Sequence, residues 1–246
     1  MNDVKTNKKQ EIQQREQQLL ETAGRILLNE GYSELSMERL ADELKTAKGT
    51  IYNHFPNREE IVLAMAVQAI NKRQDLFDAA STSKGNSRMR MLAVGVACEI
   101  YVRSYPSYFL VENLVSHSSI WDRCSERRRD LMRNYEHRCM GLVAGIARSG
   151  MADGDLELRH GLSPEEMVLS LWALTSGSYL IGATSPSLLE IGIRSVYRSV
   201  RIGILQTVNG FNWQPIWSLD EHEKRIHEIA ATVFPEEPAL PRIEDE

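Results

Sequence analysis

The sequence has few cysteines, and none of them has the spacing that a zinc ribbon or a disulfide framework requires. Cys98, Cys124 and Cys139 are the only three, and no C-x-x-C pair occurs. Each lies in helix-forming sequence, where a cysteine usually acts as a small, half-buried hydrophobic residue. These positions therefore favour a packing role over redox sensing.

Long apolar runs are missing as well. No stretch approaches the length of about 20 residues that a membrane-spanning helix needs. The first residues include Asn2, Asp3 and Lys5, and they lack the apolar core of a signal peptide. We therefore expect a cytoplasmic protein that does not enter a membrane. Its 42% of hydrophobic residues is enough for a real core.

Strand-like alternation is absent over any useful length, and nearly every periodic segment predicts a helix. The fold class is therefore predicted to be all-α. A first helix ends at Gly31. Its apolar face consists of Leu19, Leu20, Ala23, Ile26 and Leu27.

Residues 36–55 predict two short helices joined by a tight turn. Ser36 is placed to cap the first helix, and Pro56 ends the second. Ile51 and Phe55, four residues apart, anchor the second helix on one side. Its other side is polar, as a helix that reads the major groove must be, although an ordinary helical hairpin with a solvated face has the same composition. The polar residues are Lys48, Thr50, Tyr52, Asn53 and His54.

The run AKGTIYNHFPNREEI, from Ala47 to Ile61, resembles the recognition-helix signature of the TetR/AcrR family of transcriptional regulators. The similarity extends over about residues 13–73, which is that family's whole DNA-binding domain, and a match of this length is specific. The resemblance implies a three-helix domain over residues 13–73, with the helix-turn-helix at 36–55. A larger helical domain for ligand binding and dimerisation is expected to follow over residues 74–246.

The resemblance also implies roles for single residues. Lys48 and Thr50 match the groove-facing start of the recognition helix. Tyr52 and His54 match its phosphate-contacting aromatic positions, and Arg58 stands where a phosphate-contacting lysine is usual. The full set expected to bind DNA is Ser36, Thr46, Ala47, Lys48, Thr50, Tyr52, Asn53, His54 and Arg58.

Two positions depart from the family pattern. Lys45 stands where the turn usually has a glycine, so the backbone there must accommodate a side chain. Ala47 stands where the recognition helix often starts with serine or threonine, which makes Thr46 the expected cap. Both departures leave the base preference open.

The net charge of the chain does not by itself indicate a nucleic-acid partner. Its net charge is −5, and residues 1–60 hold nine Lys/Arg and eleven Asp/Glu, a net charge of −2. Basic residues such as Lys48, Arg58 and those near the N-terminus could still gather on the side that faces DNA. We therefore expect only modest non-specific affinity.

Past residue 74 the resemblance becomes a pattern of helices. Ser163, Pro164 and Glu166 mark one helix start. In the family, the last two long helices pair with those of a second copy, so the resemblance implies a homodimer; packing inside one monomer is the alternative. The apolar stripe expected to form this seam is Leu189, Ile193, Val196, Val200 and Ile204.

The resemblance also implies a pocket for a small-molecule effector among the middle helices. For any one of the candidate aromatic residues, plain core packing is the alternative. The arginines between 123 and 133 offer an anion site or a solvated helix face. The candidate lining residues are Tyr101, Tyr105, Tyr108, Phe109, Trp121, Trp172 and Tyr179.

No enzyme motif is found: a G-x-S-x-G elbow, a P-loop and a glycine-rich dinucleotide fingerprint are all missing. His222 and His227 are five residues apart, on different faces of a helix, so they cannot share a zinc ion. We expect no cofactor. The resemblance implies a DNA-binding transcriptional regulator, and we expect a repressor that binds a palindromic operator and is released by a small ligand. A DNA-binding architectural factor without an inducer is the alternative.

The C-terminal residues are acidic. Residues 220–246 hold nine acidic and three basic side chains, with prolines at 235, 238 and 241. This composition predicts one amphipathic helix followed by a mobile acidic tail.

Overall fold

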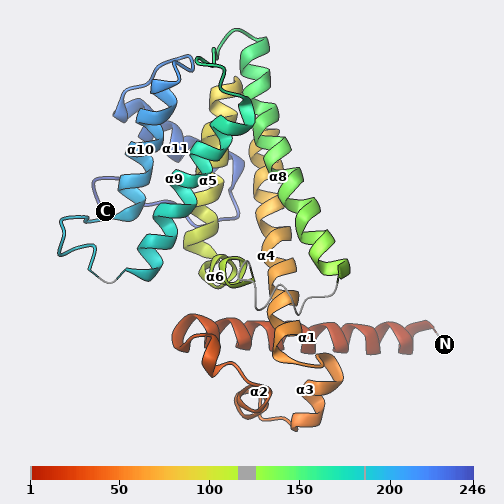
Figure 1. The fold of residues 1–246 in the computed structure, drawn as a ribbon. Helices are drawn as coiled ribbons and strands as arrows, with labels where there is room; N and C mark the ends of the chain where they lie inside the picture. Colours follow the sequence, from red (N-terminus) through yellow and green to blue (C-terminus); the bar gives the residue numbers. More distant parts are fainter. Residues whose placement is uncertain (1, 116–125, 186) are drawn as a thin grey trace. The chain divides into compact units, whose positions relative to one another are not determined.

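The computed structural model describes residues 2–115, 126–185 and 187–246 (Figure 1). Within these residues all regular elements are helices, which confirms the all-α prediction. The chain forms two compact units, each made of two separate segments of sequence. The first unit consists of residues 1–72 and 105–133, and the second of residues 73–104 and 134–246.

The first unit contains the predicted helix-turn-helix. Its long helix α1 is followed by a short 3-10 turn, two short helices and the start of α4. Its elements are α1 (Asn2–Glu30), η1 (Tyr32–Glu34), α2 (Met37–Glu43), α3 (Lys48–His54), the N-terminal part of α4 (Arg58–Ser81), α6 (Pro106–Val115) and the start of α8 (Glu126–Ala152).

The core of the first unit is apolar, and α6 belongs to it. Helix α6 packs against α1, and its Val111 and Val115 are fully buried in the same cluster as Leu19 and Ile26. This helix lies outside the residues 13–73 that the sequence assigned to the DNA-binding domain. The packing of α2 and α3 therefore depends on a core that includes residues distant in sequence.

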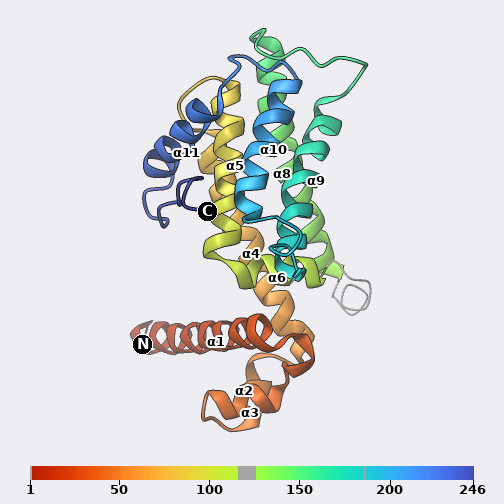
Figure 2. The ribbon, with the colours of Figure 1, turned by 90° about the vertical axis from the view of Figure 1, so that its left-hand side faces the viewer.

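The second unit is a bundle in which α10 packs on α9, and α11 on α5 (Figure 2). Helix α9 starts as predicted: Ser163 and Glu166 form a capping box, and Pro164 occupies the first turn. Besides the remaining residues of α4 and α8, its helices are α5 (Ser87–Ser104), α9 (Pro164–Thr184), α10 (Val196–Gly210) and α11 (Leu219–Val233).

The predicted helix through the stripe from Leu189 to Ile204 is wrong in its first part. Residues 187–192 form turns, and Gly192 has a φ of 87°, a value that a continuing helix does not accommodate. Ser195 then caps α10, its side chain accepting a hydrogen bond from the backbone N–H of Arg198. Leu189 and Ile193 therefore precede the helix, whereas Val196, Val200 and Ile204 lie on it.

The prediction of a mobile tail after α11 is also wrong. Helix α11 has its own capping box, formed by Ser218 and Glu221. In residues 234–246, Phe234 and Leu240 are buried in the second unit. The acidic composition of this segment suggested a solvated tail. Composition does not reveal that some of its apolar and charged side chains contact residues elsewhere in the chain.

Trp213 and Trp217, for which the sequence suggested no role, are both buried in the second unit. The Trp213 indole donates a hydrogen bond of 3.0 Å to the Ser87 hydroxyl. The buried Arg88 guanidinium donates to the Trp213 carbonyl and lies 4.4 Å from the centre of the Trp217 ring. Burial lowers the pKa of Arg88 to about 10. These contacts anchor the connection between α10 and α11 to the start of α5.

Candidate nucleic-acid interface

The helix-turn-helix is held by one cap and two apolar anchors. The Ser36 hydroxyl accepts a hydrogen bond of 3.0 Å from the backbone N–H of Arg39, so Ser36 caps α2 as predicted. Leu40 of α2 is fully buried, and the buried side chains of Ile51 and Phe55 anchor the inner side of α3. The outer side of α3 is left to solvent.

The turn before α3 has the conformation that glycine favours. Lys45 has a φ of 50°, in the left-handed region, so a side chain is accommodated there as predicted. The prediction that Thr46 caps α3 is wrong. Ala47 is the N-cap residue, and it makes no side-chain cap hydrogen bond because alanine has no oxygen to offer. The backbone N–H of Thr46 instead closes the end of α2 by donating to the Ala41 carbonyl at 3.0 Å.

The exposed side of α3 presents Lys48, Tyr52 and Asn53 together, with Thr50 half-buried beside them. The Lys48 ammonium lies 5.8 Å from the centre of the Tyr52 ring. It also forms an ion pair with Glu38 of α2. The hydrogen bond between these two groups raises the pKa of Lys48 and lowers the pKa of Glu38.

His54 and Arg58, the other expected phosphate contacts, are engaged within the first unit. The His54 Nδ1 lies 3.5 Å from a Glu16 carboxylate oxygen, and its side chain is largely buried. Arg58 donates to the Leu35 carbonyl at 3.1 Å, and its guanidinium lies 4.5 Å from the centre of the Tyr32 ring. The structure thus gathers Lys48, Tyr52 and Asn53 on one surface and directs His54 and Arg58 towards the protein.

Several acids of the first unit are neutralised by neighbouring arginines. Arg39 pairs with Glu30 at 3.2 Å and with Glu43 at 3.1 Å, and Arg25 pairs with Glu43 at 2.9 Å. These pairs reduce the repulsion that the negative net charge implies. Glu38 differs from these acids because its partner is Lys48, on the exposed side of α3.

The chain matches known proteins over this same region. Residues 19–65 match the model of the family described as bacterial regulatory proteins, tetR family. This part of the chain is therefore a TetR-type N-terminal domain, as found in transcriptional regulators of the TetR/AcrR family. TetR-family regulators bind DNA, and both helices of the helix-turn-helix described above lie within the matched residues.

Other proteins resemble the chain within this domain and beyond it. The HTH-type transcriptional regulator EthR of Mycolicibacterium smegmatis is 30% identical over 94 residues, which are 38% of this chain and 42% of EthR. The fatty acid metabolism regulator protein of Bacillus subtilis is 18% identical over 191 residues, covering 73% of this chain and 94% of that protein. A protein from Saccharomonospora viridis, solved in complex with choline, shares the fold with a TM-score of 0.64 and 20% identity; the match covers 80% of this chain and 96% of the other.

The candidate ligand-binding aromatics are divided between the two units. In the first unit, the Tyr105 and Tyr108 rings are stacked with their centres 5.8 Å apart, and Phe109 is half-buried nearby in α6. In the second unit, Tyr101 and Tyr179 are buried whereas Trp172 is 42% exposed. Trp121 lies outside the described residues.

Nothing in the sequence indicated that Glu38 pairs with Lys48, and removal of the Glu38 carboxylate should strengthen DNA binding. In the Glu38→Gln variant, Lys48 no longer has to leave an anionic partner, and one negative charge per subunit is removed beside the DNA. We expect affinity for operator DNA to rise about threefold to tenfold. Fluorescence anisotropy at 0.1 M salt measures this, with Glu34→Gln as the control for charge alone. Weaker binding by Glu38→Gln would mean that Glu38 positions Lys48 for DNA.

Proposed function

We propose that this TetR-family regulator is a cytoplasmic repressor that binds a palindromic operator as a homodimer and is released by a small ligand bound in the second unit. The observation that carries this proposal is the exposed surface of α3. There Lys48, Tyr52 and Asn53 offer hydrogen-bond donors, while Ile51 and Phe55 fix the helix from behind. In a two-fold dimer, two such helices would enter the major groove about 34–36 Å apart, or at a multiple of one turn.

Helix α9 supports the proposed dimer. Leu169, Trp172 and Leu180 are 53%, 42% and 39% exposed and share one side of the helix, whereas Met167 and Leu171 on the other side are buried. By length and composition alone this helix could cross a membrane, which corrects the expectation from sequence that no apolar stretch is long enough. Because one side is already buried in the bundle, we assign the exposed apolar side to a second copy of the chain instead.

This proposal moves the interface from the stripe expected on the following helix. Val200 is buried within the second unit, which favours the alternative that part of the stripe packs inside the monomer. A side chain at Gly182 would come within 2.9 Å of Val196, so Val196 packs closely on α9 of its own chain. Leu189 is 72% exposed and stays in the proposed interface.

Two relatives support a small-molecule effector. The S. viridis protein holds choline in its solved structure, and the B. subtilis relative is named a fatty acid metabolism regulator. In this chain, buried aromatic residues of the second unit, Tyr101 and Tyr179, remain the proposed lining residues. An architectural factor without an inducer would need no such site, and titration of the DNA complex with candidate effectors separates the two functions.

The DNA-reading role of α3 is tested by Lys48→Ala and Tyr52→Phe. Two Lys48 residues act in each dimer, so Lys48→Ala should flatten the slope of log K against log salt by about 2 if both contact phosphates. Tyr52→Phe keeps the ring but removes one donor, and should weaken binding with little change in that slope. Anisotropy across a salt series measures both, on DNA from upstream of the gene.

The matched control is Lys84→Ala, which removes an exposed lysine from the second unit. Circular dichroism should show that all three variants are folded. A loss confined to one operator position would assign Lys48 to a guanine edge instead of phosphate. Unaltered affinity and slope in both folded α3 variants would contradict the proposal that α3 reads the DNA.

A further inference from the structure

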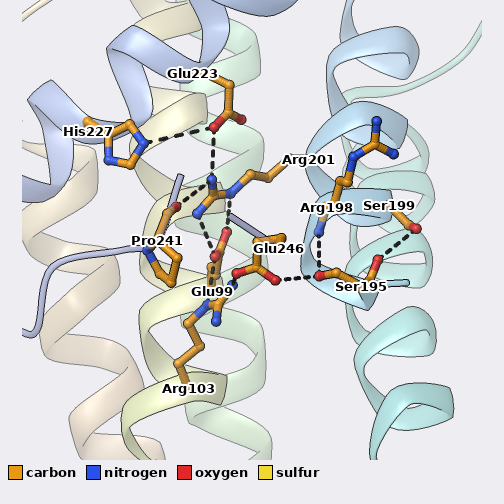
Figure 3. Close-up of polar contacts among 10 residues, drawn as sticks. All are labelled: Glu99, Arg103, Ser195, Arg198, Ser199, Arg201, Glu223, His227, Pro241 and Glu246. Carbon is orange, nitrogen blue, oxygen red and sulfur yellow. Dashed lines mark hydrogen bonds and ion pairs between the residues drawn. The ribbon is translucent and has the colours of Figure 1, made fainter. Parts of the chain in front are cut away.

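The C-terminal segment, residues 234–246, places an acidic side chain in a basic site of the second unit (Figure 3). One oxygen of the Glu246 carboxylate forms an ion pair with the Arg103 guanidinium, at the end of α5. The other oxygen accepts a hydrogen bond of 2.5 Å from the hydroxyl of Ser195, the N-cap residue of α10. The Glu246 side chain is only 9% exposed. The carboxylate is therefore bound as a ligand would be.

The groups that bind this carboxylate are fixed independently of Glu246. Arg103 donates at 2.8 Å to Glu99, one turn earlier on α5, and its guanidinium lies 3.5 Å from the centre of the Tyr197 ring. Ser195 is held at the start of α10, where its side chain accepts from the backbone N–H of Arg198 at 3.2 Å. A guanidinium and a hydroxyl at a helix N-terminus suit an anion. The site is thus formed by Arg103 of α5 and the N-cap residue of α10 and does not depend on the C-terminal segment.

Glu246, by contrast, is delivered by a segment with few anchors. Leu240 is buried, and the Pro241 carbonyl accepts a hydrogen bond of 3.1 Å from Arg201 (Figure 3). After these two residues, Arg242, Glu244 and Asp245 are exposed. Ordering such residues costs conformational entropy that few buried contacts offset. Displacing the Glu246 side chain therefore disturbs little of the core.

We propose that Arg103 and Ser195 form a carboxylate-binding site, that Glu246 occupies it as an internal ligand, and that a free monocarboxylate can replace Glu246 there. The neighbouring surface indicates the class of ligand. The Tyr197 ring beneath Arg103 packs against the Tyr179 ring, with the ring centres 5.5 Å apart. A short apolar chain attached to the carboxylate would find aromatic surface beside the site. Replacement of Glu246 by the free monocarboxylate would release the C-terminal segment from the first turn of α10.

This site is defined without reference to DNA, so its test is independent of the repressor proposal. Sodium hexanoate serves as the probe, and hexanamide is the matched uncharged compound. Isothermal titration of the full-length protein measures binding. A tethered competitor acts at an effective concentration in the millimolar range, so removing its charge in Glu246→Gln should tighten hexanoate binding by at least about tenfold. Glu244→Gln makes the same charge change at an exposed position and should bind as the unmodified protein does.

A second measurement follows the release of the segment itself. Trypsin cleavage after Arg242 releases the part of the segment that carries Glu246, and intact-mass spectrometry detects this loss from the folded protein. Hexanoate should accelerate cleavage of the unmodified protein towards the rate of the Glu246→Gln variant, and hexanamide should not. Equal hexanoate binding by the unmodified and Glu246→Gln proteins would overturn the proposal. The proposal would also be overturned if Glu246→Gln bound hexanoate more tightly but hexanoate did not accelerate cleavage of the unmodified protein, because hexanoate would then bind without displacing Glu246.

Discussion

Replacing Arg201 with methionine should lower the free energy of unfolding by about 3–5 kcal/mol. The Arg201 side chain is 3% exposed, donates to both oxygens of Glu99 at 2.7 and 2.8 Å, and reaches Glu223 at 2.9 Å (Figure 3). Burial alone would lower the pKa of Arg201, but the hydrogen bonds and charges of Glu99 and Glu223 outweigh it and raise the pKa. Without the guanidinium, two buried carboxylates lose their shared partner.

Urea denaturation followed by circular dichroism measures this loss. Arg198→Met is the control, because Arg198 lies one turn earlier on α10 with an exposed side chain; it should change stability by no more than about 0.5 kcal/mol. Adding Glu223→Gln to Arg201→Met should recover part of the loss, since one of the buried charges is then neutral. A drop below about 1 kcal/mol in Arg201→Met would place the cluster at the level of a solvated surface pair.

Replacing Leu180 with arginine should convert the proposed dimer into monomers and abolish specific operator binding. In the interface proposed for α9, the two-fold axis brings the substitution in twice, and each unpaired buried charge costs several kcal/mol. Operator binding should fail as well, because one subunit contacts only one half-site. Light scattering coupled to size exclusion measures the mass, and anisotropy measures DNA affinity.

The monomer should remain folded, since Leu180 is 39% exposed and lies away from the core of the second unit. Met151→Arg is the matched control: Met151 is 43% exposed, on α8 of the same unit. It should stay dimeric. A Leu180→Arg protein that keeps the dimer mass would place the interface on another surface, and a monomeric protein with full operator affinity would disconnect DNA binding from dimerisation.

The features predicted correctly from sequence depend on residues close to one another in the chain. Ser36 caps α2, and Ser163 with Glu166 begins α9, because a cap and its partner are only three residues apart. The buried side of α3 follows from Ile51 and Phe55 at helical spacing. Local patterns therefore predicted the two short helices and the buried side of α3, whereas the DNA-binding role assigned to the exposed side came from the family resemblance and stays a prediction.

The features that were missed depend on distant residues or on single backbone angles. Glu38 faces Lys48 only because the left-handed turn at Lys45 folds α2 back beside α3. Glu99 and Arg201 are 102 positions apart, and their buried pair has no sequence signal. The stripe from Leu189 looked helical because periodicity does not reveal that Gly192 adopts a positive φ.

The placement of α6 in the first unit limits how that unit can be exchanged between regulators. The first unit takes Val111 and Val115 into its core, although they follow α3 by more than fifty positions. A chimaera that joined residues 1–73 to the ligand-binding part of another regulator would lack Val111 and Val115. The apolar face of α1 that packs against α6 would then be exposed. Recombination that transfers the whole first unit from one regulator to another must therefore exchange two separate stretches of coding sequence. The second stretch includes residues 105–115. A biosensor designed by swapping readers should treat those stretches as one part.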